Sequence, residues 1–222
     1  MLKFLELVAF FISTAAFGYG AFYLFRSGIP KLFKLYVCAA GCYMLEELWA
    51  VVNTYMGYGI QDGLITVRLF GIFGCLCFML SANINEFDRV VDEGRDRKSR
   101  RRAMIAPAVL VVLFGISAFC SVNTLSVAMI VIGFISISPA LPASFFSLKH
   151  LLLEDDSMGF LKAVRETDFV ALVFYAGNFL YPLASLYWSR TAMCGYDMAL
   201  AVIISGIMIM CRKGAVKWET LI

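Results

Sequence analysis

Residues 103–121 read AMIAPAVLVVLFGISAFCS, a run of nineteen residues without a charged side chain. At 1.5 Å per residue, a helix of this length spans roughly 28 Å, which matches the hydrocarbon core of a bilayer. Six further apolar stretches of comparable length occupy most of the 222-residue chain, which is 61% hydrophobic and only 16% charged. The pattern predicts an all-α integral membrane protein.

The seven stretches predict a single seven-helix membrane domain over residues 1–222, because no segment between them is long enough for a soluble domain. The longest connecting segment is 86–102, and it is strongly charged. The expected transmembrane helices cover 3–26, 32–57, 63–85, 103–121, 125–150, 167–189 and 195–212.

Lysine and arginine are distributed unequally between the two sides of this predicted bundle. One side carries Arg26, Lys31, Lys34, the cluster from Arg89 to Arg102, Lys149, Lys162, Arg165, Arg212, Lys213 and Lys217. The other side carries only Lys3, Arg68 and Arg190. The positive-inside rule therefore predicts an N-terminus outside, a cytoplasmic C-terminus and insertion in the plasma (inner) membrane.

A shift of 131 residues brings the first three predicted helices onto the last three. Gly28, Lys31 and Lys34 then align with Gly159, Lys162 and Arg165, and Glu47 aligns with Asn178. This register indicates a 3+1+3 parallel triple-helix repeat, as found in several transporters. The plan is similar to that of SWEET-type sugar transporters and of microbial rhodopsins. Residues 195–211 contain no lysine, so a retinal Schiff base in the last helix is excluded.

Polar residues inside the predicted spans indicate a binding site, because ionisable groups are costly in a bilayer. Residues 43–53 read YMLEELWAVVN and contain adjacent carboxylates. Arg68 on the next helix is long enough to reach them, and Pro139, Pro142 and Pro182 favour kinks nearby. The predicted ligand site comprises Glu46, Glu47, Trp49, Asn53, Arg68, Asn178 and Tyr181. The competing interpretation is that these residues only hold the helices together.

Residues 83–103 read NINEFDRVVDEGRDRKSRRRA, and we expect them to extend the helix over 63–85 into the cytoplasm. This segment is either a solvated anchor or a docking surface for a cytoplasmic protein. The predicted partner-binding residues are Arg97, Lys98, Arg100 and Arg101.

Asp88, Arg89 and Asp92, followed by Arg97 and Arg101, resemble the first aspartate motif of UbiA-type prenyltransferases. The resemblance implies magnesium and a prenyl diphosphate at the cytoplasmic mouth, since carboxylates bind hard cations. It covers about twenty residues. The family's leading Asn-Asp pair falls on Ile84 and Asn85, and Glu154, Asp155 and Asp156 do not form its second motif.

Histidine and cysteine usage argues against a metal or haem cofactor. His150 is the only histidine, and we expect it at the cytoplasmic membrane interface. Seven cysteines lie mostly within helices without zinc-ligand spacing. Cys120 and Cys194 are both expected near the outer surface, where a disulfide between them is one alternative.

Two non-enzymatic functions follow from these features, and a net charge of +3 does not indicate a nucleic-acid partner. The first is a small transporter for a polar or cationic solute, in which Glu46 or Glu47 binds a proton or cation beside Arg68. The second is a ligand-sensing or accessory subunit that signals through 86–102. The expected partners are the bilayer, the solute, and either a second copy of the chain or a cytoplasmic protein.

Overall fold

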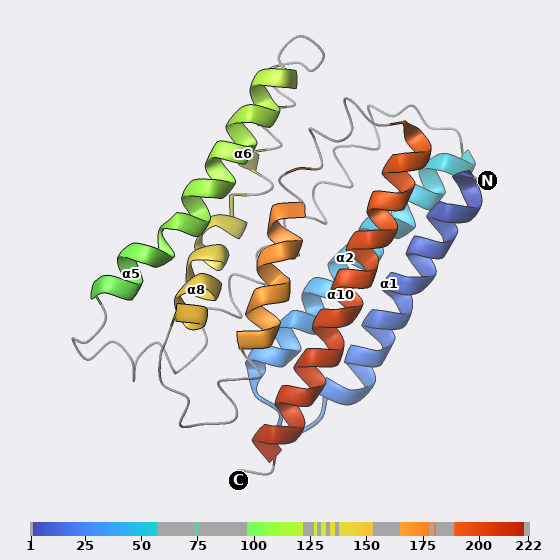
Figure 1. Ribbon diagram of the computed structural model, residues 1–222. Coiled ribbons are helices and arrows are strands. Elements are labelled where there is room, and N and C mark those ends of the chain that lie inside the picture. Colours follow the sequence, from blue (N-terminus) through green and yellow to red (C-terminus); the bar gives the residue numbers. More distant parts are fainter. Residues whose placement is uncertain are drawn as a thin grey trace.

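Every regular element in the described part of the chain is helical, as the computed structural model shows (Figure 1). The structure describes residues 2–56, 74, 97–121, 127, 130–131, 134–135, 138–152, 165–177, 180 and 189–219. The labelled helices are α1 (Leu2–Leu24), α2 (Lys31–Met56), α5 (Arg97–Ala103), α6 (Ile105–Ser121), α8 (Ala140–Leu152) and α10 (Arg190–Glu219). A further helical segment, 165–177, lies between α8 and α10 in Figure 1.

Within the described residues, four helices are long and apolar enough to cross a membrane, which supports the predicted transmembrane helices, and the helical elements confirm the all-α fold. They cover Phe4–Leu24, Lys31–Met56, Arg100–Cys120 and Thr191–Val216. The predicted helix over 63–85 lies outside the described residues apart from Gly74, and the helices over 125–150 and 167–189 are described only in part. The count of seven, the orientation and the 3+1+3 repeat therefore stay predictions.

The last span is longer than expected, since α10 begins at Arg190 rather than at 195 and continues to Glu219. Ser189 explains the early start because it caps the helix. Its Oγ accepts the N–H of Ala192 at 3.3 Å, and its carbonyl accepts the N–H of Met193 at 3.0 Å. A serine in this position satisfies backbone donors that a helix start leaves open.

The charged segment ends in a helix that leads into α6. Residues 97–103 form α5, Met104 is a turn, and α6 follows directly. Pro107 accounts for the interruption, because it has no N–H for the carbonyl four residues earlier. The N–H of Met104 still bonds the Arg100 carbonyl at 3.3 Å, so the two helices remain joined. Up to residue 96, the predicted extension of the helix over 63–85 lies outside the described residues.

A turn at Ser138 and Pro139 interrupts the predicted helix over 125–150, and α8 begins immediately after it. The N–H of Ser138 bonds the Phe134 carbonyl at 2.9 Å, and the N–H of Leu141 bonds the Ser138 carbonyl at 3.1 Å. Pro142 lies in the first turn of α8, where a missing N–H costs little. The segment that carries His150 is therefore a separate short helix.

α1 packs along both α2 and α10 (Figure 1). Gly20 lies where all three meet. A Cβ placed there would come within 2.7 Å of Met208 Sδ and 3.1 Å of Val37 Cγ2. Small residues allow this close approach between membrane helices, where association depends on packing. The buried core around it includes Phe33, Val37, Ile204, Ile207 and Met208.

We expect Gly20→Leu to destabilise the bundle by about 1–3 kcal/mol, because the new side chain overlaps Met208 and Val37. The measurement is the melting temperature of the purified protein in a neutral detergent. Gly18→Leu is the matched control, since a Cβ at Gly18 meets nothing within 4 Å. Equal melting temperatures for the two variants would contradict the packing described here.

Candidate functional site

Two buried polar clusters lie along one face of α2. Tyr36, Tyr43 and Glu47 are all buried. Their spacings of seven and four residues place them on the same side of the helix. Tyr36 belongs to an inner cluster near the C-terminal end of the bundle, whereas Tyr43 and Glu47 belong to an outer cluster. The clusters are separated by roughly 16 Å along the helix axis at 1.5 Å per residue.

The outer cluster centres on Glu47, which is only 5% exposed within a membrane-spanning helix. The Tyr43 side chain interacts with the Glu47 carboxylate. The Tyr43 hydroxyl donates to the main-chain carbonyl of Asp197 on α10 at 3.2 Å. The Tyr43 ring packs edge-on against Phe174, with the ring centroids 5.7 Å apart. Glu47 is therefore held where α2 meets α10 and the 165–177 helix.

Acidic groups from three helices gather in this region. Glu6 of α1 acts electrostatically on Glu47, and Glu46 and Asp197 act on Tyr43 beside it. The thiol of Cys194 on α10 lies 3.9 Å from Glu6 Oε1, which ties the start of α1 to this end of α10. Glu47 makes no ion pair within the described residues. The resulting negative potential favours a cation.

Trp49 and Asn53 lie further along α2, on a different face of the helix from Glu47. Trp49 Nε1 and Asn53 Oδ1 are buried atoms, and neither has a hydrogen-bond partner in the part of the chain that the structure describes. Buried polar groups are normally paired, so one free donor and one free acceptor are notable here. A spacing of one helical turn places them within reach of a small polar solute.

The predicted ligand residues fall into two groups. Glu46, Glu47, Trp49 and Asn53 lie together on α2, with Glu47 rather than Glu46 as the buried carboxylate. Arg68, Asn178 and Tyr181 lie outside the described residues. The predicted docking residues Arg97, Lys98, Arg100 and Arg101 are all on α5, and the last two are exposed. The aspartates of the UbiA-like motif, Asp88 and Asp92, also fall outside the described residues.

The inner cluster centres on Asp168, a buried carboxylate at the start of the 165–177 helix. His150 Nδ1 lies 2.8 Å from Asp168 Oδ2. Ser147 Oγ and the Tyr36 hydroxyl donate to Asp168 Oδ1 at 3.2 Å and 3.3 Å. Asp168 therefore receives contacts from two positions on α8 and one on α2, which fills most of its hydrogen-bonding capacity.

Further polar residues surround this cluster. Lys149 and Thr167 are each 1% exposed. Thr167 interacts with the buried thiol of Cys211 on α10, and Arg165 Nε donates to the carbonyl of His150 at 3.2 Å. The inner cluster thus joins α2, α8, the 165–177 helix and α10. A carboxylate bound in this way is stabilised in low dielectric by its own hydrogen bonds.

Sequence reasoning missed this cluster. His150 was expected at the membrane interface, but it is 3% exposed and bound to Asp168. The available signal was weak: the only histidine ends one predicted helix, and an aspartate stands at the second position of the next. Consecutive antiparallel helices meet at that end, yet nothing in the spacing indicates that the two side chains face each other.

The disulfide alternative is wrong, because neither Cys120 nor Cys194 takes part in a disulfide bond. Among the described residues, no group of three or more histidine, cysteine, aspartate or glutamate side chains is arranged to hold a metal ion. Comparison of the chain with protein-family models, with curated proteins and with solved structures finds no match in any of the three.

We expect Asp168→Asn to destabilise the protein by about 3 kcal/mol, because His150 would lose a buried carboxylate partner. For a chain of this size, the melting temperature would fall by roughly 6–12 °C. Glu166→Gln is the matched control, since Glu166 is exposed on the same helix. An Asp168→Asn protein as stable as Glu166→Gln would show that the His150–Asp168 contact contributes nothing.

Proposed function

We propose that this chain is a small transporter for a polar or cationic solute, with Glu47 as the carboxylate that binds a proton or a cation. The burial of Glu47, which has no ion pair among the described residues, carries the proposal. A carboxylate inside a membrane span is expensive, and such residues commonly mark the path of a substrate or proton. A bound cation or proton would neutralise it in the transport cycle.

The neighbours of Glu47 support a solute site of this kind. Glu6, Glu46 and Asp197 add negative charge around it. Trp49 Nε1 and Asn53 Oδ1 supply a donor and an acceptor that lack partners within the described residues. The negative charge around Glu47 favours a solute that carries a positive charge, whereas Trp49 and Asn53 offer their polar atoms on another face of α2.

The inner cluster supports alternating access, because its hydrogen bonds hold helices together on one side of the bundle. Asp168, His150, Ser147 and Tyr36 join three helices roughly 16 Å from Glu47 along α2. α8 is separated from the preceding helix by the turn at Ser138 and Pro139. A short helix after a proline turn can swing with little strain, which would break these bonds and open the inner side.

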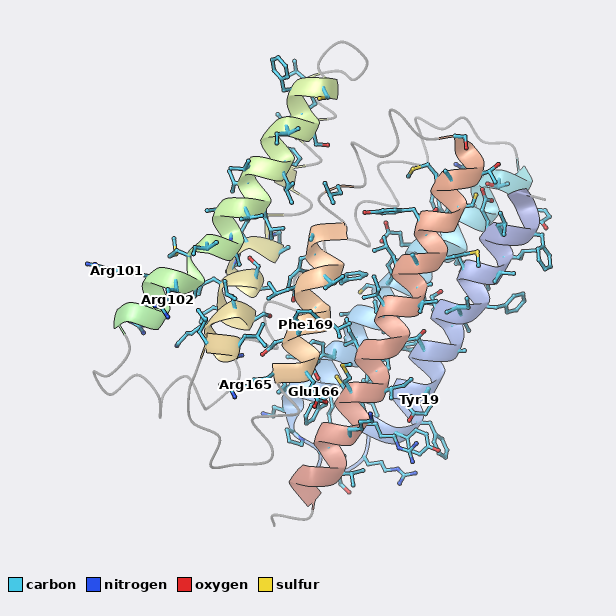
Figure 2. All side chains as sticks on the ribbon, viewed as in Figure 1. Tyr19, Arg101, Arg102, Arg165, Glu166 and Phe169 are labelled. Atoms are coloured by element: carbon cyan, nitrogen blue, oxygen red, sulfur yellow. The ribbon has the colours of Figure 1, made fainter. Side chains whose placement is uncertain are left out.

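The proposed orientation places the inner cluster toward the cytoplasm of the plasma membrane. Figure 2 shows Arg101, Arg102 and Arg165 toward the end of the bundle where the C-terminus lies. α1 ends and α2 begins at that end, so Arg26, Lys31 and Lys34 belong to it as well. The positive-inside rule favours this end as the cytoplasmic one.

We expect Glu47→Gln to lower solute-driven proton movement by at least about 10-fold, because a buried charge contact to the solute is lost. The protein is reconstituted in liposomes that contain a pH-sensitive dye, and guanidinium, tetramethylammonium, choline and glucose are added in turn. Glu46→Gln is the matched control, since Glu46 is adjacent, chemically identical and less buried. The same probes should raise the melting temperature of the wild type but not of Glu47→Gln.

Two results would contradict the transport proposal. One is the absence of any probe-dependent pH change in the wild type together with unchanged melting temperatures. The other is a Glu47→Gln protein that is only less stable and otherwise responds like the wild type. Either result would assign Glu47 a structural role between α2 and α10.

A second candidate function, a sensing or accessory subunit, is favoured by the exposure of α5. Arg100, Arg101 and Arg102 are exposed on a helix that continues into α6, which presents them on a firm support. Exposed arginines on such a helix suit an acidic surface of a cytoplasmic protein.

If the second function holds, replacing Arg97, Lys98, Arg100 and Arg101 by glutamine should abolish capture of that protein without changing membrane insertion. The measurement is co-purification of a single stoichiometric protein from the native membrane at moderate salt. The control carries Arg26→Gln and Lys31→Gln. Loss of the protein from both variants would indicate nonspecific charge attraction.

A further inference from the structure

Two arginines from opposite ends of the chain converge on aromatic rings near the C-terminal end of α1. The guanidinium carbon of Arg212, on α10, lies 3.9 Å from the Tyr23 ring centroid and 5.5 Å from that of Tyr19. Arg212 Nη1 also donates to the Tyr19 hydroxyl at 2.8 Å. The guanidinium carbon of Arg26 lies 5.8 Å from the same Tyr23 ring and 5.3 Å from Phe22.

The rings form one aromatic platform under both cations. The Tyr19 and Tyr23 centroids are 4.8 Å apart, and Phe22 meets Tyr23 edge-on at 4.9 Å. A guanidinium that stacks on an aromatic ring is attracted by the negative face of the ring, and the stacking holds the planar group in one orientation. Two positive charges are thereby fixed around Tyr23 although they repel each other.

No carboxylate neutralises this pair within the described residues, since neither Arg26 nor Arg212 takes part in an ion pair there. Lys213 and Lys31 are exposed and lie at the same end of the bundle, which adds further positive charge. A guanidinium that is stacked on one face can still donate from its N–H edge, and among the described residues Arg212 uses only one N–H, on the Tyr19 hydroxyl, of the five that a guanidinium carries. The arrangement is therefore complementary to a phosphate group.

The setting indicates a lipid as the source of that phosphate. Arg26 comes two residues after α1 ends, where the chain leaves the predicted span. The adjacent aromatic rings are exposed: Phe22 by 66% and Phe25 by 54%. Cations beside exposed aromatic rings at the end of a membrane helix match the boundary between lipid headgroups and acyl chains.

We propose that Arg26 and Arg212, oriented by Tyr19, Phe22 and Tyr23, bind the phosphate of an anionic phospholipid. Phe22 and Phe25 would contact its acyl chains, so headgroup and chains are recognised together. This site is distinct from the Glu47 region, which lies toward the opposite end of α2. The proposal holds whether or not the chain is a transporter.

The test is titration of the purified protein in a neutral detergent with phosphatidylglycerol, phosphatidylcholine or inorganic phosphate, read by native mass spectrometry. An ionic strength of about 0.5 M shortens the Debye length to roughly 4 Å, which suppresses general charge attraction. We expect Arg26→Gln with Arg212→Gln to weaken phosphatidylglycerol binding by roughly 10-fold to 30-fold. Arg100→Gln with Arg101→Gln removes the same charge from exposed arginines of α5 and should stay within about twofold of the wild type.

Arg26→Gln alone guards against a folding failure, because Arg26 is exposed and its contacts among the described residues are with aromatic rings. It should weaken phosphatidylglycerol binding while leaving the helical circular dichroism signal unchanged. Equal weakening in the two double variants would overturn the proposal, as would equal affinity of the wild type for phosphatidylcholine. Displacement of phosphatidylglycerol by inorganic phosphate at the same concentration would overturn the assignment to a lipid and indicate a soluble anion.

Discussion

A carboxylate inside a helical membrane bundle must find its hydrogen bonds on neighbouring helices, because lipid offers none. Asp168 meets this requirement through His150, Ser147 and Tyr36, at distances between 2.8 and 3.3 Å. These contacts determine how α8, the 165–177 helix and α2 are placed relative to one another. The same requirement explains why the three partners are themselves buried on their helices.

The packing of α1 against α2 and α10 follows a different rule. Apolar side chains gain little by leaving lipid for a helix interface, so close fit decides which helices associate. Gly20 provides that fit at the point where Met208 and Val37 come closest to α1. On the opposite side of the molecule, α6 exposes Val112, Ile116 and Phe119, as a helix surface in contact with lipid does.

The two clusters on α2 differ in how well they are satisfied, and this asymmetry has functional meaning. The inner carboxylate is surrounded by donors from other helices, whereas Glu47 has an interaction with Tyr43 and acidic neighbours. A satisfied network holds a conformation, and an under-satisfied acidic site attracts a ligand. The two clusters lie roughly 16 Å apart along the same helix, and the transport proposal assigns a holding role to the first and a binding role to the second.

The sequence by itself determined that this is an all-helical membrane protein. The length of an apolar run is a local property, and it can be compared directly with the thickness of the bilayer core. It also placed Glu46, Glu47, Trp49 and Asn53 on one helix, and four predicted spans correspond to helices that can cross a membrane. The hydrophobic pattern did not predict two features of the helix ends. These are the Ser189 cap that starts α10 early and the break at Pro107 between α5 and α6. Only the tertiary structure decided that Glu47 rather than Glu46 is buried, that His150 binds Asp168, and that Arg26 and Arg212 share the Tyr23 ring. These facts depend on how helices are rotated about their axes. Rotation is set by contacts between residues far apart in the sequence, such as His150 with Asp168 and Arg212 with Tyr23, which no local pattern encodes.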